Sequence, residues 1–378
     1  MTTKPGPARA GSAVRCKSSP SVGEMATALV LAAAAASCLS AEPALTDDEA
    51  HGAAASPGGE GAGQVPAVSD DPEAIAADCP FAHTRQVAVA TAAQLRTALA
   101  DAVPGDLILL ADGTYTGTFA ASTSGTASRR IVLCGSRRAV LQGTSFQSAR
   151  GIHLTASFWT LAGFTITNSQ KGVMVDGGHH NELIGLEVRN IGHEAVHFRK
   201  HSSDNVLRDS FIHDTGLANA GFGEAVYLGS AQSNWSSLTD GQPDRADRNQ
   251  VIGNTLGPNV TAEAIDVKEG TTGGAIRNNT FNGAGMSGAN FADSWVDVKG
   301  NRYAIEGNRG NSSRKDGFQT HVILSSWGND NVFAGNTADV GGSGFGFLVA
   351  GNSTGNVVRC NNTVTNAGAG FANVTCQP

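Results

Sequence analysis

Three charged residues lie close together in the stretch "EAIDVKEG", residues 263–270: Glu263, Asp266 and Lys268. The residues between them are small or apolar, and only 16% of the chain is charged, so this concentration of charge points to a site. Carboxylates can hold a divalent cation. A lysine can remove a proton when burial or neighbouring charges bring its pKa toward the working pH. The stretch therefore contains the groups that a metal-assisted acid–base reaction needs.

Four other segments align with this one. Together the five read "GHEAVHFRK" (192–200), "FGEAVYLGS" (222–230), "TAEAIDVKE" (261–269), "ADSWVDVKG" (292–300) and "KDGFQTHVI" (315–323). Each has an acid near its start: Glu194, Glu224, Glu263, Asp293 and Asp316. Alternate side chains of a β-strand point to opposite faces, so the apolar residues at 265 and 267 should point inward. The residues expected on the outer face are His197, Arg199, Tyr227, Asp266, Lys268, Asp297, Lys299, Gln319 and His321.

The elements that position these side chains repeat along the chain. Short units with alternating apolar residues, broken by Asn and Gly, recur roughly every 24 to 28 residues beyond residue 150, a period typical of a solenoid. Examples are "NELIGLEVRNIG" at 181, "NQVIGNTLG" at 249 and "NVFAGNTADVGG" at 331. These units predict an all-β, single-stranded, right-handed parallel β-helix with hydrogen-bonded Asn ladders in its turns. Residues 92–102 are predicted to form a helix that caps the N-terminal end.

Stacked coils would bring the aligned residues into columns with a spacing of about 4.8 Å. Lys268 and Lys299 then lie on adjacent coils, where each ammonium is expected to lower the pKa of the other. Asp266 and Asp297 oppose that effect unless calcium occupies them. A long exterior groove of this kind suits a linear polymer. In a uronate-containing polysaccharide, a base can remove the proton at C5 and the bond to O4 can break, provided that the sugar carboxylate is neutralised.

The stretches "AQLRTALADAVPGDLILLADGTYTG" (93–117) and "EAIDVKEGTTGGAIRNNTFNG" (263–283), with the Asn-rich coils, resemble the β-helical polysaccharide lyases, above all the chondroitinase B and alginate lyase family. The resemblance implies that Glu263 binds calcium and that Lys268 is the base. That family carries an arginine, within an Arg-His-Gly run, on the next coil. This sequence has "VDVKGN" (296–301) there, so Lys299 takes the place of the arginine. The chain is also similar to the β-helical pectate lyases, which agree on Lys268 and differ in substrate.

We therefore expect a calcium-assisted lyase whose partner is an acidic polysaccharide. The catalytic assignments are Lys268 as the base, Tyr227 as a proton donor, and Arg199 and Lys299 as groups that bind or polarise the substrate carboxylate. The residues assigned to calcium are Glu263 and Asp266, with Asp293 or Asp297. The residues assigned to substrate binding are His197, His321 and Trp235. Trp235 belongs to the insertion 229–248, which interrupts the repeat directly after the Tyr227 segment.

Two other classes of function remain open. A glycoside hydrolase needs two carboxylates at a defined separation, which Asp266 with Asp297, or Glu263 with Asp293, could supply. A non-catalytic surface protein would use the solenoid only to bind carbohydrate. A hydrolase would give saturated products and stay active after Lys268→Ala, whereas a surface protein would bind without forming any product.

The N-terminal region predicts export. Within residues 1–41, Lys and Arg precede "MATALVLAAAAASCLSA" (25–41), which fits the apolar region of a secretory signal and is too short for a confident membrane span. Either Met1 or Met25 can be the start. A lipid anchor at Cys38 on a surface or periplasmic lipoprotein is the alternative to a secreted, extracellular chain. Residues 42–78 have few large apolar residues and predict a disordered linker, which leaves residues 79–378 as the β-helix domain.

Export also permits disulfides. The four cysteines of the predicted domain suggest the pairs Cys79–Cys134 and Cys360–Cys376, although sequence alone leaves the connectivity open. The net charge of −7 and the lack of a basic stripe argue against nucleic acid as a partner. We expect the protein to be a monomer.

Overall fold

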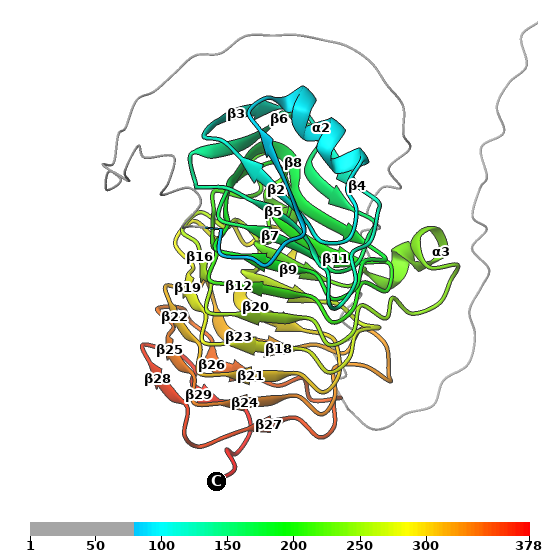
Figure 1. The fold of residues 1–378 in the computed structure, drawn as a ribbon. Coiled ribbons are helices and arrows are strands. Elements are labelled where there is room, and N and C mark those ends of the chain that lie inside the picture. The colour runs from blue at the N-terminus through cyan, green and yellow to red at the C-terminus, as the bar shows by residue number, and fades with distance from the viewer. Residues whose placement is uncertain (1–78) are drawn as a thin grey trace, which may run out of the picture. The chain divides into compact units, whose positions relative to one another are not determined.

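The computed structural model describes residues 79–378, so the predicted signal segment (1–41) and linker (42–78) lie outside the described residues. The described chain winds into coils whose strands stack in parallel, as the repeat predicts (Figure 1). One ladder is an 11-stranded sheet. Its strands, in spatial order, are β1 (Arg85–Val89), β2 (Asp106–Leu110), β5 (Ile131–Cys134), β7 (Trp159–Ala162), β9 (Glu182–Ile184), β12 (Val206–Arg208), β15 (Gln250–Ile252), β18 (Ala275–Arg277), β21 (Ala304–Glu306), β24 (Val332–Ala334) and β27 (Val357–Val358).

Two further ladders meet at the long strands β6 (Ala139–Leu154) and β8 (Thr165–Asp176), whose first halves belong to one ladder and whose second halves belong to the other. The second ladder continues through β3 (Gly113–Thr116), β10 (Glu187–Ile191), β13 (Phe211–His213), β16 (Thr255–Leu256), β19 (Thr280–Asn282), β22 (Arg309–Asn311), β25 (Thr337–Asp339) and β28 (Thr363–Thr365). The third ladder contains β4 (Phe119–Ala121), β11 (Val196–Arg199), β14 (Val226–Leu228), β17 (Ile265–Val267), β20 (Ser294–Val298), β23 (Asp316–Thr320), β26 (Phe345–Leu348) and β29 (Gly370–Ala372). The third ladder carries the aligned segments.

Helix α2 (Ala92–Ala100) lies at the N-terminal end of the ladders (Figure 1). The Thr91 side chain caps it by accepting the N–H of Gln94, and Leu95 and Leu99 are buried beneath it. The helix ends two residues earlier than predicted, because the chain turns at residues 101–105 to enter β2. The remaining helices are short and lie in turns: η1 (Ala220–Phe222), η2 (Gln232–Asn234), α3 (Trp235–Leu238) and η3 (Ala289–Phe291).

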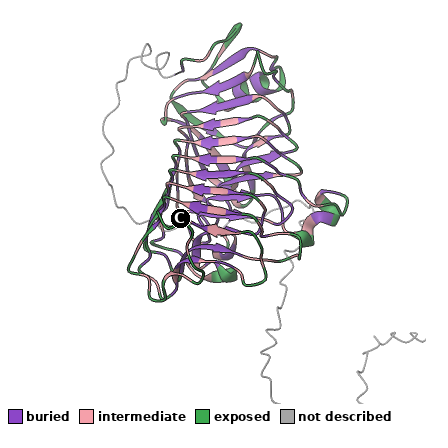
Figure 2. Ribbon diagram, turned by 90° about the horizontal axis from the view of Figure 1, so that it is seen from below, coloured by how far each residue is buried: buried purple, intermediate pink, exposed green. Residues whose placement is uncertain are grey.

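The core runs along the inside of the stacked coils, and exposed residues gather in the turns (Figure 2). In the third ladder Val226, Ile265 and Val296 pair across successive coils and are fully buried. Larger rings fill the C-terminal half, where Trp295 and Phe318 pack against each other. Each inward residue therefore packs on its counterparts in the coils above and below, which holds the strands in register.

Buried asparagines form ladders at the turns, as predicted. The Asn279 side-chain amide donates to Asn308 Oδ1 at 3.0 Å, and the Asn308 amide donates to Asn336 Oδ1 at 2.9 Å. The same amides also donate to backbone carbonyls, and the Oδ1 atoms accept backbone N–H groups. Because unpaired buried amides are costly, each rung depends on its neighbours.

Two disulfides, Cys79–Cys134 and Cys360–Cys376, confirm the predicted pairing. The first ties the start of the described chain to β5, and the second ties the C-terminal segment to the last coil. No helix between residues 79 and 378 is long and apolar enough to cross a membrane.

Candidate active site

The outward residues of the third ladder form one column across successive coils. Parallel pairing places His197 beside Tyr227, Tyr227 beside Asp266, and Asp266 beside Asp297, with Gln319 next. The apolar residues that flank these positions are buried in the core, which confirms the predicted alternation. The column members themselves are at most 5% exposed. They therefore lie on the outer face of the sheet but are covered by neighbouring side chains.

Both lysines of the site are bound by aspartates. Lys268 Nζ lies 2.8 Å from Asp266 Oδ2, while Lys299 Nζ lies 2.6 Å from Asp266 Oδ1 and 2.7 Å from Asp297 Oδ2. Burial alone would lower the pKa of each ammonium, but the charges of these aspartates outweigh it and raise both pKa values. The predicted opposition between the two effects is therefore present: Lys268 lowers the pKa of Lys299, while Asp266 and Asp297 raise it. Their mutual repulsion is present, but attraction to shared carboxylates exceeds it.

Tyr227 lies between two groups from neighbouring coils. Lys268 Nζ lies 4.8 Å from the centroid of the Tyr227 ring. On the other side, the His197 ring meets the Tyr227 ring edge-on with a centroid distance of 4.5 Å. The Lys268 ammonium thus lies over the face of the Tyr227 ring, so the predicted base and the predicted proton donor are neighbours on adjacent coils.

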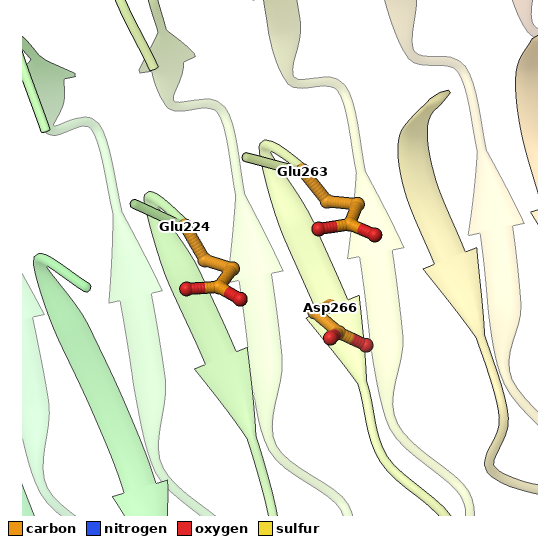
Figure 3. Close-up of side chains that lie close together, drawn as sticks. All are labelled: Glu224, Glu263 and Asp266. Atoms are coloured by element: carbon orange, nitrogen blue, oxygen red, sulfur yellow. The ribbon is translucent and has the colours of Figure 1, made fainter. Parts of the chain in front are cut away.

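Three buried carboxylates, Glu224, Glu263 and Asp266, lie next to these groups (Figure 3). Figure 3 shows Glu224 and Glu263 at the starts of neighbouring strands and Asp266 farther along the second strand. Burial and the charge of Asp266 raise the pKa of Glu263 to about 8. Burial and the charge of Glu263 also raise the pKa of Glu224 well above its usual value. The cluster therefore has an excess of negative charge that a proton or a cation would relieve.

The donor set of this cluster fits a calcium ion. One oxygen from each of the three carboxylates can be chosen so that all lie within 4.8 Å of one another. Calcium binds oxygen at about 2.3–2.6 Å, so oxygens on opposite sides of the ion lie about 4.6–5.2 Å apart. Hard carboxylate oxygens are also the ligands that calcium prefers.

Of the four predicted ligands, Glu263 and Asp266 belong to this cluster. Asp297 is engaged by Lys299 and by His321, whose Nδ1 lies 2.7 Å from Asp297 Oδ1. Asp293 lies 3.3 Å from Lys315 and accepts a hydrogen bond from Gln319. Ser294, rather than Asp293, pairs with Asp316 in the next coil, so an additional residue shifts Asp293 out of the column of acids.

Arg199 and His197 lie on β11, beside the strand that carries Tyr227, and other groups of the protein bind both side chains. Arg199 Nε donates to Asp176 Oδ1 at 2.7 Å, and Asp176 also contacts His153. His197 Nδ1 lies 2.9 Å from Glu194 Oε1, and its Nε2 lies 2.7 Å from the carbonyl oxygen of Gly229. Both ring nitrogens are therefore engaged, which argues against the predicted direct contact between His197 and substrate.

The two other predicted substrate contacts differ in accessibility. The His321 side chain is 44% exposed and remains available at the rim of the site. Trp235 is buried, and its indole N–H donates to the carbonyl oxygen of Ser230 at 3.0 Å. The prediction that Trp235 contacts substrate is not supported, because its ring is buried against the protein.

No catalytic or binding role was predicted for Glu224, Glu194 or Lys171. Glu224 stands at the same position of its aligned segment as Glu263, so the alignment itself indicates that the two carboxylates can lie together. Lys171 contacts Glu194 closely, although it lies in a coil that had not been aligned. That contact needed the pairing of β8 with β11, which the sequence repeat did not define.

Comparisons with known proteins agree with the fold. Residues 82–232 match the family model described as "Pel9A-like, right handed beta helix region". The alginate lyase from Paenibacillus sp. str. FPU-7 has 40% sequence identity and a TM-score of 0.71, covering 77% of this chain and 99% of that chain. Pectate lyase Pel9A has 16% identity and a TM-score of 0.52, covering 79% and 82%, and so shows a similar fold. The search of curated proteins found no significant match.

The identity and coverage of the Paenibacillus enzyme are high enough to define a family, and the family model supplies the right-handed winding predicted from the repeats. The chain therefore belongs to the right-handed parallel β-helical polysaccharide lyases, in the family of the Paenibacillus alginate lyase.

Proposed function

We propose that the protein cleaves a uronate-containing polysaccharide by calcium-assisted β-elimination, with alginate as the first substrate to test. The observation that carries the proposal is the meeting of Lys268 and Tyr227 on the outer face, beside three buried carboxylates. The similarity to an alginate lyase over most of the chain supports the choice of substrate.

In the proposed reaction Lys268 is the base and Tyr227 is the acid. Lys268 Nζ takes the proton from C5, the electron pair of that bond forms the double bond between C4 and C5, and the bond from C4 to O4 breaks. Tyr227 donates its phenolic proton to the departing O4. This leaves an ammonium at residue 268 and a phenolate at residue 227. Return of the proton from the lysine to the neighbouring tyrosine would reset the site.

Lys268 can act as a base only in its neutral form. It can reach that form only when another positive group balances the charge of Asp266. In the arrangement described above, Asp266 holds Lys268 as an ammonium, and Lys299 supplies part of the balancing charge. When bound at Glu224, Glu263 and Asp266, calcium would supply the remaining positive charge and neutralise the sugar carboxylate. Lys299 and Arg199 add positive charge along the same face, and His321 at the rim is the proposed substrate contact.

The main test is a product assay on alginate, pectate, chondroitin and glucuronan. Wild-type protein with calcium should yield products with the ultraviolet absorbance of an unsaturated uronate end. Lys268→Met and Tyr227→Phe should each reduce turnover by about 10²- to 10⁴-fold, the usual contribution of an acid–base group. Tyr303→Phe is the matched control, since Tyr303 is a buried tyrosine on another ladder whose hydroxyl donates only to Thr271. It should keep wild-type turnover.

Other outcomes would identify a different function. Saturated products with an active Lys268→Met variant would indicate a glycoside hydrolase. Binding to a polysaccharide without any product would indicate a non-catalytic protein. Full activity after chelation of calcium, with no recovery or gain when calcium is restored, would remove the metal from the proposal while leaving the elimination intact.

We also propose that the protein is secreted. The two disulfides of the described domain need an oxidising compartment, and a polymeric substrate lies outside the cell. Fractionation of an expressing culture should find the activity in the medium. Recovery in the membrane fraction that depends on Cys38 would instead support the lipoprotein alternative.

A further inference from the structure

His197 is a buried histidine to which the proposed reaction gives no task. It is 5% exposed and lies on β11, directly beside Tyr227 on β14. Glu194, two residues before β11, contacts its Nδ1, and the Gly229 carbonyl just beyond β14 contacts its Nε2. The edge of the ring packs on the phenol ring of Tyr227.

The two partners of His197 fix the orientation of its ring. A backbone carbonyl can only accept a hydrogen bond, so Nε2 must carry a proton. At the other end Nδ1 meets the Glu194 carboxylate, which Lys171 also contacts. The ring is therefore held at both ends, by groups from two neighbouring coils.

We propose that His197 is a positioning residue for Tyr227: a ring anchored at both nitrogens whose edge holds the phenol ring in one orientation. This inference rests on the proposed role of Tyr227 as the acid. The two rings meet edge-on with a centroid distance of 4.5 Å, so the anchored histidine restricts the phenol and keeps the proton donor aligned with the departing oxygen.

The charged groups around this pair come from three coils. From β11 the phenol faces His197, backed by Glu194 and through it by Lys171 on β8. From β17 it faces Lys268 and Asp266. Glu224, which lies three residues before Tyr227 and just upstream of β14, is the nearby acid of the same coil.

The test is a double-mutant cycle on alginate with His197→Gln, Tyr227→Phe and the combined variant. Glutamine can still donate to the Gly229 carbonyl but has no ring to pack on Tyr227. His197→Gln alone should lower kcat by about 10- to 100-fold, with KM changed less than about threefold. In the Tyr227→Phe background the same substitution should cost less than about threefold, because its effect passes through the tyrosine.

A matched control is His213→Gln. His213 also has both ring nitrogens next to carboxylates, Asp214 and Glu187, and stacks on Phe211, but it lies on the second ladder. This variant should keep wild-type kcat and the wild-type pH profile. An equal loss from His197→Gln in both backgrounds would overturn the proposal, because it would show a purely structural role.

A measurement on the unmodified protein covers the case in which His197→Gln does not fold. Nitrogen-15 spectra of histidine-labelled wild-type protein should show His197 with a protonated Nε2, as its contact with the Gly229 carbonyl requires. An unprotonated Nε2 would overturn the proposal, because the ring would then not be anchored at both ends. Failure of the proposed function is recognised separately, because wild-type protein would then form no unsaturated product or Tyr227→Phe would remain fully active.

Discussion

The asparagine ladder and the outer column of the third ladder are built in the same way, with one side chain from each coil, but they differ in what they stack. The ladder repeats one residue type: Asn254, Asn279, Asn308, Asn336 and Asn362. The column changes at every coil: His197, Tyr227, Asp266, Asp297 and Gln319. Identical amides can form the same hydrogen bond between any number of successive coils. In a column of different groups, each contact between neighbouring coils is of a different kind.

The two stacks also differ in how completely their polar groups are balanced. Asn279, Asn308 and Asn336 each accept from one neighbouring asparagine of the ladder and donate to the next. The site instead collects four buried carboxylates around two ammonium groups: Glu224, Glu263, Asp266 and Asp297, with Lys268 and Lys299. We infer that the first stack stabilises the solenoid, and that the second sacrifices stability for the ability to bind charge.

Removing Lys299 should give the largest loss of stability. Lys299→Met would leave Asp266 and Asp297 without the ammonium that joins them, and breaking a buried ion pair from one side typically costs about 3–5 kcal/mol. Urea unfolding in the absence of calcium measures this. Lys315→Met is the control, because the Lys315 side chain is 49% exposed and its ion pairs should contribute at most about 1 kcal/mol. Equal stability of the two variants would mean that the site is not internally balanced by Lys299.

Removing one rung of the asparagine ladder should cause a smaller loss of stability and should leave the activity unchanged. Asn308→Ala would leave buried groups of Asn279 and Asn336 without partners, at a cost of about 2–3 kcal/mol. Turnover per folded molecule should stay at the wild-type level, because no charged group of the site moves. Asn361→Ala is the control: Asn361 also accepts a backbone N–H, but at the surface. A loss of turnover in Asn308→Ala at temperatures where it is folded would contradict the division between the two stacks.

The sequence predicted the fold better than the site, for a physical reason. A strand alternates with a period of two, so the orientation of Ile265 and Asp266 follows from a few letters of sequence. The repeated asparagines likewise predicted a ladder, because identical residues at one position of every coil have only each other to meet. Both features depend on spacing alone, and both are present in the structure.

Partners across coils depended on details that spacing does not contain. Lys299 reaches back to Asp266 as well as to Asp297, which depends on the length and rotamer of its side chain. Glu224 joins the carboxylate cluster and Asp293 does not, because Ser294 occupies the register position opposite Asp316. The burial of Trp235 depends on how the insertion folds on itself. None of these follows from the repeat.

The pH dependence of stability should give the smallest effect when it is expressed per pH unit, and it tests the unbalanced charge directly. Without divalent cations, the pKa of Glu263 is raised to about 8 in the folded protein, whereas a glutamate in the unfolded chain titrates near pH 4.3. Between about pH 4.3 and 8 the folded protein therefore holds a proton that the unfolded chain has lost. Stability should fall as the pH rises through this window, by at most about 1.4 kcal/mol per pH unit from this group.

Glu263→Gln cannot ionise, so it should flatten this slope in urea unfolding with a chelator present. Some slope should remain, because the pKa of Glu224 is also raised and contributes with the same sign. Glu306→Gln is the control, since that side chain is 40% exposed and paired with Arg277, and it should leave the slope unchanged. Calcium should reverse the effect near pH 8 in the wild type by stabilising the ionised carboxylate, but much less in Glu263→Gln. If both proteins kept the same slope and the same response to calcium, the cluster would be as well balanced as the asparagine ladder, and the contrast between the two stacks would fail.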